Sequence, residues 1–170
     1  MALEQPLYEE SKKILFRDIY KNLNLFLYPA YSDGTNTASN NTPVTQLADA
    51  ATKLAYFSCI IPSDLRLLSM KFIWSTPAAS GNLRWQVDIG EGGESDANNA
   101  RTTGGTAVTT ATITTADDIN FTEILDQGAI SISKLNSGNL WGIKFSRLGA
   151  AAEDTLGQVV NLYGIIMTFK

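Results

Sequence analysis

The stretch that decides the fold runs from residue 140 to residue 169 and reads LWGIKFSRLGAAAEDTLGQVVNLYGIIMTF. In its first part Trp141, Ile143 and Phe145 would share one face of a strand with Arg147, because successive side chains of a strand point to opposite faces. The intervening Gly142, Lys144 and Ser146 are small or polar. This alternation predicts an antiparallel strand with one face in a core, and it points to a β-sandwich without an active site.

The last part of the stretch predicts a longer strand over residues 158–169. Its faces would consist of Val159, Tyr163, Ile165, Met167 and Phe169 on one side and Leu162, Gly164, Ile166 and Thr168 on the other. Because both sets are mainly apolar, both faces are expected to be covered, as in a sandwich or an assembled particle.

Outward from this stretch, apolar runs alternate with turn clusters, as in antiparallel sandwiches. The strands expected are 53–61, 66–75, 82–90, 106–114, 119–125, 129–134, 139–147 and 158–169. A further strand is expected just before Pro29, over residues 23–28. Since no helical pattern separates these strands, we expect an all-β chain, a single jelly-roll antiparallel β-sandwich with a short N-terminal helix or arm.

Two parts of the chain are expected, residues 1–47 and the sandwich over 48–170. Residues 1–24 carry balanced charges, and the spacing of Tyr8, Leu15 and Ile19 predicts a short amphipathic helix. That helix would either cover one end of the core or act as an arm that docks on a neighbouring subunit. Residues 32–46 are nearly all small and polar, which predicts a loop.

The composition is that of a single domain with enough apolar residues for one core, at 170 residues and 44% hydrophobic. The net charge is −4 and the basic residues are scattered, so nucleic acid is not expected as a partner. No apolar run approaches membrane-spanning length, and the first residues are too polar for a signal peptide, so we expect synthesis in a cytosol and no membrane partner. The single cysteine, Cys59, lies in an apolar run, which favours a small buried hydrophobe over a reactive thiol.

The sequence contains no histidine, which removes the usual general base and the commonest metal ligand. Acidic residues cluster between 88 and 126, namely Asp88, Glu91, Glu94, Asp96, Asp117, Asp118, Glu123 and Asp126. The oxygen-rich loop 88–96 could hold Ca²⁺, but it lacks the ligand spacing of an EF-hand, and a solvated loop is favoured. A glycosidase pair could be chosen from the same acids, yet no spacing selects one. We therefore expect no enzyme and no catalytic, cofactor or metal site.

Three tryptophans, Trp74, Trp85 and Trp141, could stack on sugar rings, as in lectin-like sandwiches. Trp85 and Trp141 share their strand faces with apolar residues, which favours the core for both. Arg147 and Asp154 flank a loop of small residues, and a charge-assisted hydrogen bond between them is expected to close it.

Several short motifs occur in an order that is similar to a known family. They are Ile61-Pro62-Ser63-Asp64, a strand closing on Trp74, Ser80-Gly81-Asn82-Leu83-Arg84-Trp85, Arg147-Leu148-Gly149, Asp154-Thr155-Leu156 and Leu162-Tyr163-Gly164. Over about residues 48–169 the chain resembles jelly-roll proteins encoded by bacteriophages, mostly small virion components. The resemblance implies a structural role, and it assigns no catalytic residue to this sequence.

The function expected is that of a non-enzymatic structural component of a bacteriophage virion, with a capsid or decoration protein ranked first. Such a protein would self-associate, with a trimer as the first choice, and would dock on other virion proteins through its N-terminal arm. It would be assembled in the host cytoplasm and reside in the virion. The alternative is a receptor-binding or tail-fibre module that binds glycans of the host surface.

Overall fold

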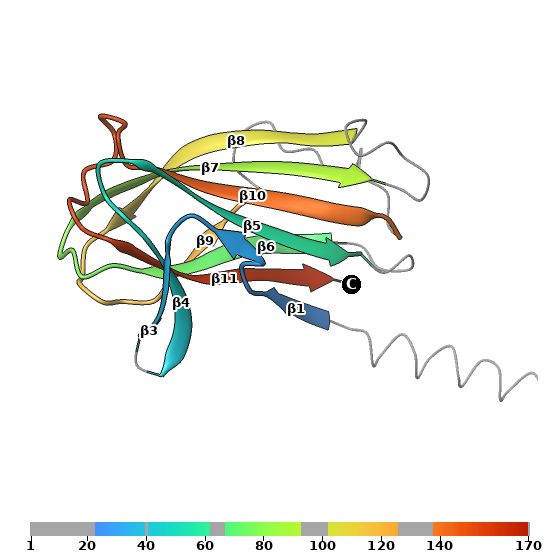
Figure 1. Cartoon of the computed structure of the whole chain (residues 1–170), viewed down its shortest axis with the longest axis horizontal. Coiled ribbons are helices and arrows are strands. Elements are labelled where there is room, and N and C mark those ends of the chain that lie inside the picture. The colour runs from blue at the N-terminus through green and yellow to red at the C-terminus, as the bar shows by residue number, and fades with distance from the viewer. Residues whose placement is uncertain (1–22, 40, 62–66, 93–101, 126–137, 170) are drawn as a thin grey trace, which may run out of the picture.

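The computed structural model describes residues 23–39, 41–61, 67–92, 102–125 and 138–169. Figure 1 shows two layers of strands packed against each other. The strands are β1 (Leu23–Leu27), β2 (Tyr31–Ser32), β3 (Thr35–Ser39), β4 (Thr42–Leu47), β5 (Thr52–Ile60), β6 (Leu67–Ser75), β7 (Gly81–Gly92), β8 (Thr102–Ile113), β9 (Asn120–Glu123), β10 (Leu140–Leu148) and β11 (Val160–Phe169). No helix in the described part of the chain is long and apolar enough to cross a membrane.

Both sheets are antiparallel throughout their registered pairs. The six-stranded sheet has the order β3-β4-β11-β6-β9, with β1 also paired to β11, and the five-stranded sheet has the order β2-β5-β10-β7-β8. From β4 to β11 the chain passes between the sheets at every connection except the hairpin β7–β8, which is the connectivity of a jelly roll. The expectation of an all-β antiparallel sandwich is confirmed. The expected N-terminal helix and the expected strand 129–134 lie outside the described residues.

The core between the sheets is built around aromatic rings. The ring centroid of Phe72 lies 4.9 Å from that of Trp85 and 4.8 Å from that of Phe145. These three side chains and Trp74 are fully buried. Trp85 and Phe145 come from strands whose apolar residues alternate, so the alternation in the sequence predicted the inner faces of β7 and β10 correctly.

Residues 32–46 do not form the expected loop. Most of the described residues in this range belong to strands. β3 and β4 form a hairpin whose register pairs Ser39 with Thr42, and β4 continues the six-stranded sheet by pairing with β11. Asn41 takes the left-handed conformation that such a tight turn needs, with φ 64. The threonines are β-branched and suit a strand in spite of their low hydrophobicity. The division expected at residue 47 therefore falls at the end of a strand inside this sheet.

The expected face pattern of the last strand holds for Ile165, Met167 and Phe169 but is wrong before Gly164. The register between β11 and β6 shifts between Leu162 and Gly164, which leaves Tyr163 as the extra residue of a β-bulge. Val160 and Leu162 before the bulge and Ile165 after it all face the core and are fully buried. One added residue moves every later side chain to the other face, so the uninterrupted alternation wrongly placed Val159 and Tyr163 on the same face as Ile165.

Candidate functional site

The edge of the six-stranded sheet is interrupted where β11 changes its partner. β1 pairs with the C-terminal half of β11 as far as Leu27 opposite Ile165. β4 pairs with the N-terminal half as far as Thr45 opposite Leu162. Tyr163 and Gly164 lie between these two ladders and have no registered partner in either, so the sheet edge is open at the bulge.

A chain of hydrogen bonds holds the bulged Tyr163. Its hydroxyl lies 3.2 Å from Ser75 Oγ on β6. Asn161 Nδ2 donates to the same Ser75 Oγ over 3.4 Å, and Gln46 Nε2 donates to Asn161 Oδ1 over 3.1 Å. The chain links β4, β11 and β6, so the orientation of the Tyr163 ring is fixed before any ligand arrives.

On the other side of the opening, Gly164 lets β1 approach closely. A Cβ atom at this position would clash with the carbonyl oxygen of Leu27 and would lie 2.6 Å from Cζ of Phe26. Only glycine fits under the Phe26 ring. That ring in turn meets the Tyr28 ring edge to face, with centroids 4.7 Å apart, and thereby fixes the position of Tyr28.

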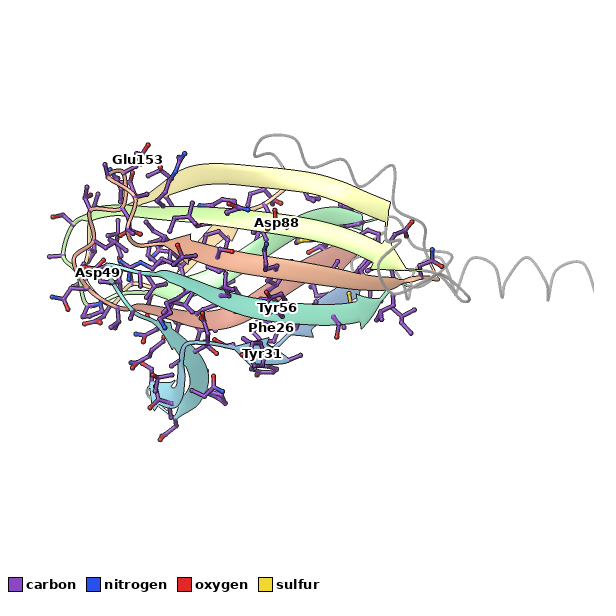
Figure 2. All side chains as sticks on the ribbon, turned by 45° about the horizontal axis from the view of Figure 1, so that its top comes forward. Phe26, Tyr31, Asp49, Tyr56, Asp88 and Glu153 are labelled. Atoms are coloured by element: carbon purple, nitrogen blue, oxygen red, sulfur yellow. The ribbon has the colours of Figure 1, made fainter. Side chains whose placement is uncertain are left out.

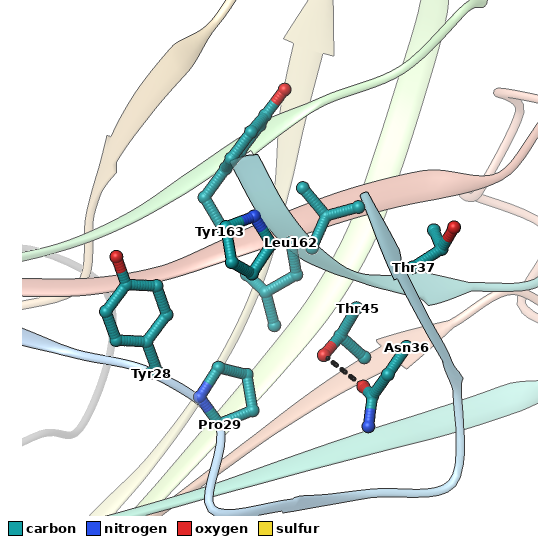
Figure 3. A pocket seen from close by; sticks show the side chains of 9 residues that line it. Tyr28, Pro29, Asn36, Thr37, Thr45, Leu162 and Tyr163 are labelled. Atoms are coloured by element: carbon teal, nitrogen blue, oxygen red, sulfur yellow. Dashed lines mark hydrogen bonds between the residues drawn. The ribbon is translucent and has the colours of Figure 1, made fainter. Parts of the chain in front are cut away.

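A pocket with a volume of about 150 Å³ occupies the opening. Figure 3 shows its walls: Tyr28 and Pro29 follow β1, Leu162 and Tyr163 belong to β11, and the remaining residues come from the β3–β4 hairpin. Leu162 is fully buried, whereas Tyr28 is 57% exposed, so the pocket leads from the sheet to the solvent. We name it the β1/β4 pocket.

The lining of the β1/β4 pocket is uncharged and rich in hydrogen-bonding groups. Thr45 Oγ1 donates to Asn36 Oδ1 over 2.9 Å, which leaves the amide N–H groups of Asn36 for another acceptor. Within the described part of the chain, the Tyr28 hydroxyl, the Thr37 hydroxyl and Nδ2 of Asn36 have no hydrogen-bond partner. Together with the tyrosine and proline rings, these groups suit a small uncharged ligand that carries several hydroxyls.

None of the tryptophans lies at this pocket. Trp74, Trp85 and Trp141 are 3% exposed or less and belong to the core, as expected for Trp85 and Trp141. The side chains that could receive a ring at the surface are tyrosines. No signal in the sequence singled out Tyr28 or Tyr163, because the site forms only when β1 and β4 meet on one edge of β11.

The acidic residues are dispersed. Asp88 lies on the outer face of β7 with Lys144 Nζ 2.6 Å away, whereas Glu91 of the same strand is buried. Glu123 accepts hydrogen bonds from Ser69 Oγ and from the Met70 backbone, and Asp117 and Asp118 are exposed in the turn before β9. Glu94, Asp96 and Asp126 lie outside the described residues. Among the residues that the structure does describe, no group of three metal-ligating side chains is found.

The expected bond between Arg147 and Asp154 is present within a larger cluster. Arg147 is fully buried, and its Nε and Nη2 atoms donate to the two carboxylate oxygens of Asp154 over 3.1 and 2.8 Å. Nη2 also donates to Asp49, and Nη1 donates to the carbonyl oxygens of Leu47 and Gln158. All five N–H groups of the guanidinium are therefore used, and the cluster is structural.

Three of the motifs that carry the phage resemblance, those containing Asn82, Arg147 and Thr155, meet near this cluster. The backbone N–H of Asn82 donates to Thr155 Oγ1 over 3.0 Å, and the N–H of Thr155 donates to the carbonyl oxygen of Asn82 over 2.8 Å. Figure 2 shows Asp49 and Glu153 at this end of the sandwich, away from Tyr31 and Tyr56. The residues of these motifs thus hold loops of the scaffold together, whereas Leu162 and Tyr163 of the last motif line the pocket.

Cys59 packs against the core, with its Sγ 4.0 Å from Sδ of Met167. Burial raises the pKa of the Cys59 thiol from 9.0 to about 11, so the thiol stays protonated at neutral pH. A protonated, half-buried thiol is a poor nucleophile, in line with the expected packing role.

No protein-family model matches the sequence, and no curated protein matches it. Solved structures are similar in fold. A chain of the isomalto-dextranase of Arthrobacter globiformis T6 complexed with panose has a TM-score of 0.50 at 15% identity, and the match covers 87% of this chain and 23% of that one. The family 11 carbohydrate-binding module of Clostridium thermocellum has a TM-score of 0.45 at 14% identity, covering 86% and 88%. A chain of infectious bursal disease virus, Gx strain, has a TM-score of 0.39 at 11% identity, covering 87% and 31%. At these identities the likeness concerns the β-sandwich fold.

Proposed function

We propose that this chain is a non-enzymatic jelly-roll module of a bacteriophage particle that binds glycans of the host surface at the β1/β4 pocket. The observation that carries the proposal is the pairing of two fixed tyrosine rings, Tyr28 and Tyr163, with unengaged hydroxyl and amide groups in one pocket. A sugar has C–H faces that pack on aromatic rings and a rim of hydroxyls that needs hydrogen-bond partners. The pocket offers both kinds of contact.

Preorganisation supports the same function. Tyr163 is held through Ser75, and Tyr28 is held by Phe26, so neither ring loses much rotational freedom when a ligand arrives. Because side-chain ordering opposes association, rings that are already fixed raise the affinity of a small site.

A binding role without turnover is supported by the chemistry of the lining. The sequence has no histidine, and none of the residues that line the pocket is an acid or a base that titrates near neutral pH. Hydrolysis of a glycosidic bond ordinarily needs a pair of carboxyl groups on either side of that bond. The pocket walls supply hydrogen bonds and packing only.

The test is binding of the full chain to an array of host-surface glycans. We expect saturable binding that falls by about tenfold or more in Tyr163→Ala and in Tyr28→Ala, since the loss of a central aromatic contact costs more than about 1 kcal/mol. Tyr31→Ala is the matched control, because Tyr31 is a 64% exposed tyrosine on β2 that does not line the pocket. Absence of binding to every glycan, or equal losses in all three variants, would contradict the proposal.

A second candidate function is a capsid-associated structural protein, as the phage resemblance implies. Ile119 and Phe121 favour it, because each is 58% exposed at the β9 side of the six-stranded sheet. Exposed apolar side chains on an edge strand fit a contact with another protein, either a further copy of this chain or another virion component.

Light scattering of the full chain tests self-association. We expect a mass well above the 18.4 kDa monomer, with a trimer as the first choice, and a shift to the monomer in Phe121→Glu, because a charge at an apolar contact opposes association. Tyr56→Glu on the outer face of the other sheet is the control and is expected to keep the oligomer. A monomer at high concentration for the unaltered chain would count against this candidate.

A further inference from the structure

We infer that the β1/β4 pocket takes one uncharged monosaccharide unit and excludes acidic sugars such as uronic and sialic acids. This inference rests on the proposed glycan binding and specifies its ligand class. Two properties of the pocket carry it, namely its size and the absence of charge from its lining.

The size of the pocket limits the ligand to a single ring. A cavity of about 150 Å³ holds one six-membered ring. Along β11 the pocket is bounded on one side by the end of β1, at Tyr28 and Pro29, and on the other by β4, which starts to pair at Leu162. A second sugar unit would have to lie outside these walls, so specificity is set by one unit.

The charge of the lining limits the ligand to neutral sugars. None of the residues that line the pocket is charged. The cations that the structure describes all lie outside this lining: Lys144 is paired with Asp88, Arg147 is fully engaged in its cluster, Lys53 donates to the carbonyl oxygen of Asp33, Arg84 donates to Thr110 Oγ1, and Lys71 belongs to β6. A carboxylate in the pocket would give up part of its hydration without gaining a positive partner, which is costly. A hydroxyl in the same place can instead hydrogen-bond to uncharged polar groups of the lining, such as the amide of Asn36.

The experiment compares binding of the full chain to neutral oligosaccharides and to counterparts in which the terminal unit is a uronic or a sialic acid. We expect neutral probes to bind at least about tenfold more tightly, with the binding dependent on Tyr163. Acidic probes that bind as tightly, and with the same dependence on Tyr163, would overturn the inference while the proposed function stands. If no probe of either kind binds, the proposed function itself fails.

A variant that gains binding of acidic sugars tests the role of charge directly, because a misfolded variant would not gain binding. Thr37 is an exposed residue of the lining, and Thr37→Lys would place a cation at the pocket. We expect this variant to shift the ratio of acidic to neutral binding toward the acidic probe by about fivefold, the effect of one favourable exposed pair. Thr114→Lys makes the same change at an exposed position that does not line the pocket and should leave the ratio unchanged. An unchanged ratio in Thr37→Lys would overturn the assignment of the sugar to this pocket.

Discussion

Replacement of Arg147 by alanine is expected to lower the free energy of unfolding by about 3–5 kcal/mol. The guanidinium is fully buried and contacts a carboxylate, that of Asp154, whose side chain is also fully buried. Its removal would leave this carboxylate without its cation and would leave the carbonyl oxygens of Leu47 and Gln158 without their donor. Urea unfolding, followed by tryptophan fluorescence and extrapolated to water, measures the loss.

Lys144→Ala is the matched control for Arg147→Ala. The ion pair between Lys144 and Asp88 has a shorter separation, 2.6 Å, but the two side chains are 36% and 24% exposed. A pair that remains in contact with water contributes about 0–1 kcal/mol, so this variant should unfold almost like the unaltered chain. If the two variants lost similar amounts, burial would not be the source of the stability of the Arg147 cluster.

The second large effect concerns the centre of the core. Trp85→Ala is expected to lower the free energy of unfolding by about 3–5 kcal/mol, because it removes a fully buried ring and leaves a cavity. The neighbouring rings of Phe72 and Phe145 would lose their packing partner. Urea denaturation of the purified variant provides the measurement. A variant as stable as the unaltered chain would show that the ring does not fill the core.

Two tryptophan-to-phenylalanine changes form a matched pair that isolates the indole N–H. Nε1 of Trp85 has no hydrogen-bond partner among the described residues, whereas Nε1 of Trp74 donates to Thr122 Oγ1 over 2.9 Å. Both rings are fully buried, so the loss of volume is the same. We expect Trp74→Phe to cost about 1 kcal/mol more than Trp85→Phe, since only the former breaks a hydrogen bond. The reverse order would contradict the hydrogen-bond pattern.

The sequence predicted the strands that bury many apolar residues, and it failed where pairing with a distant strand decides the structure. In β7 and β10, strict alternation of large apolar and polar residues makes the inner face readable from the sequence. The β3–β4 hairpin buries only a few apolar side chains, notably Val44 and Leu47, so its polar composition is typical of a loop. Its strand character comes from pairing with β11, which no local window of sequence contains.

The β1/β4 pocket could not be predicted from the sequence for a related reason. A β-bulge at Tyr163 reverses the faces of β11, and nothing but the glycine after it hints at the irregularity. The β1/β4 pocket combines residues from positions 28 to 45 with Leu162 and Tyr163, and it exists because two strands share one edge of β11. In the sequence, the tryptophans were the candidates for stacking on a sugar ring. All three are buried in the core instead, because a small sandwich buries its largest apolar side chains.

The placement of β1 also determines how the domain would carry a mechanical load. Leu23 lies opposite Phe169, whereas Leu27, at the other end of β1, lies opposite Ile165 beside the pocket. A pull between a ligand held at Tyr163 of β11 and the chain that precedes Leu23 would therefore act along the axis of β1, between this strand and β11. The hydrogen bonds of an antiparallel ladder are perpendicular to the strands, so such a pull shears all five registered pairs at once and does not unzip them one by one. β1, which shapes the pocket, would then also hold the preceding chain to the domain until the hydrogen bonds of all five pairs break together.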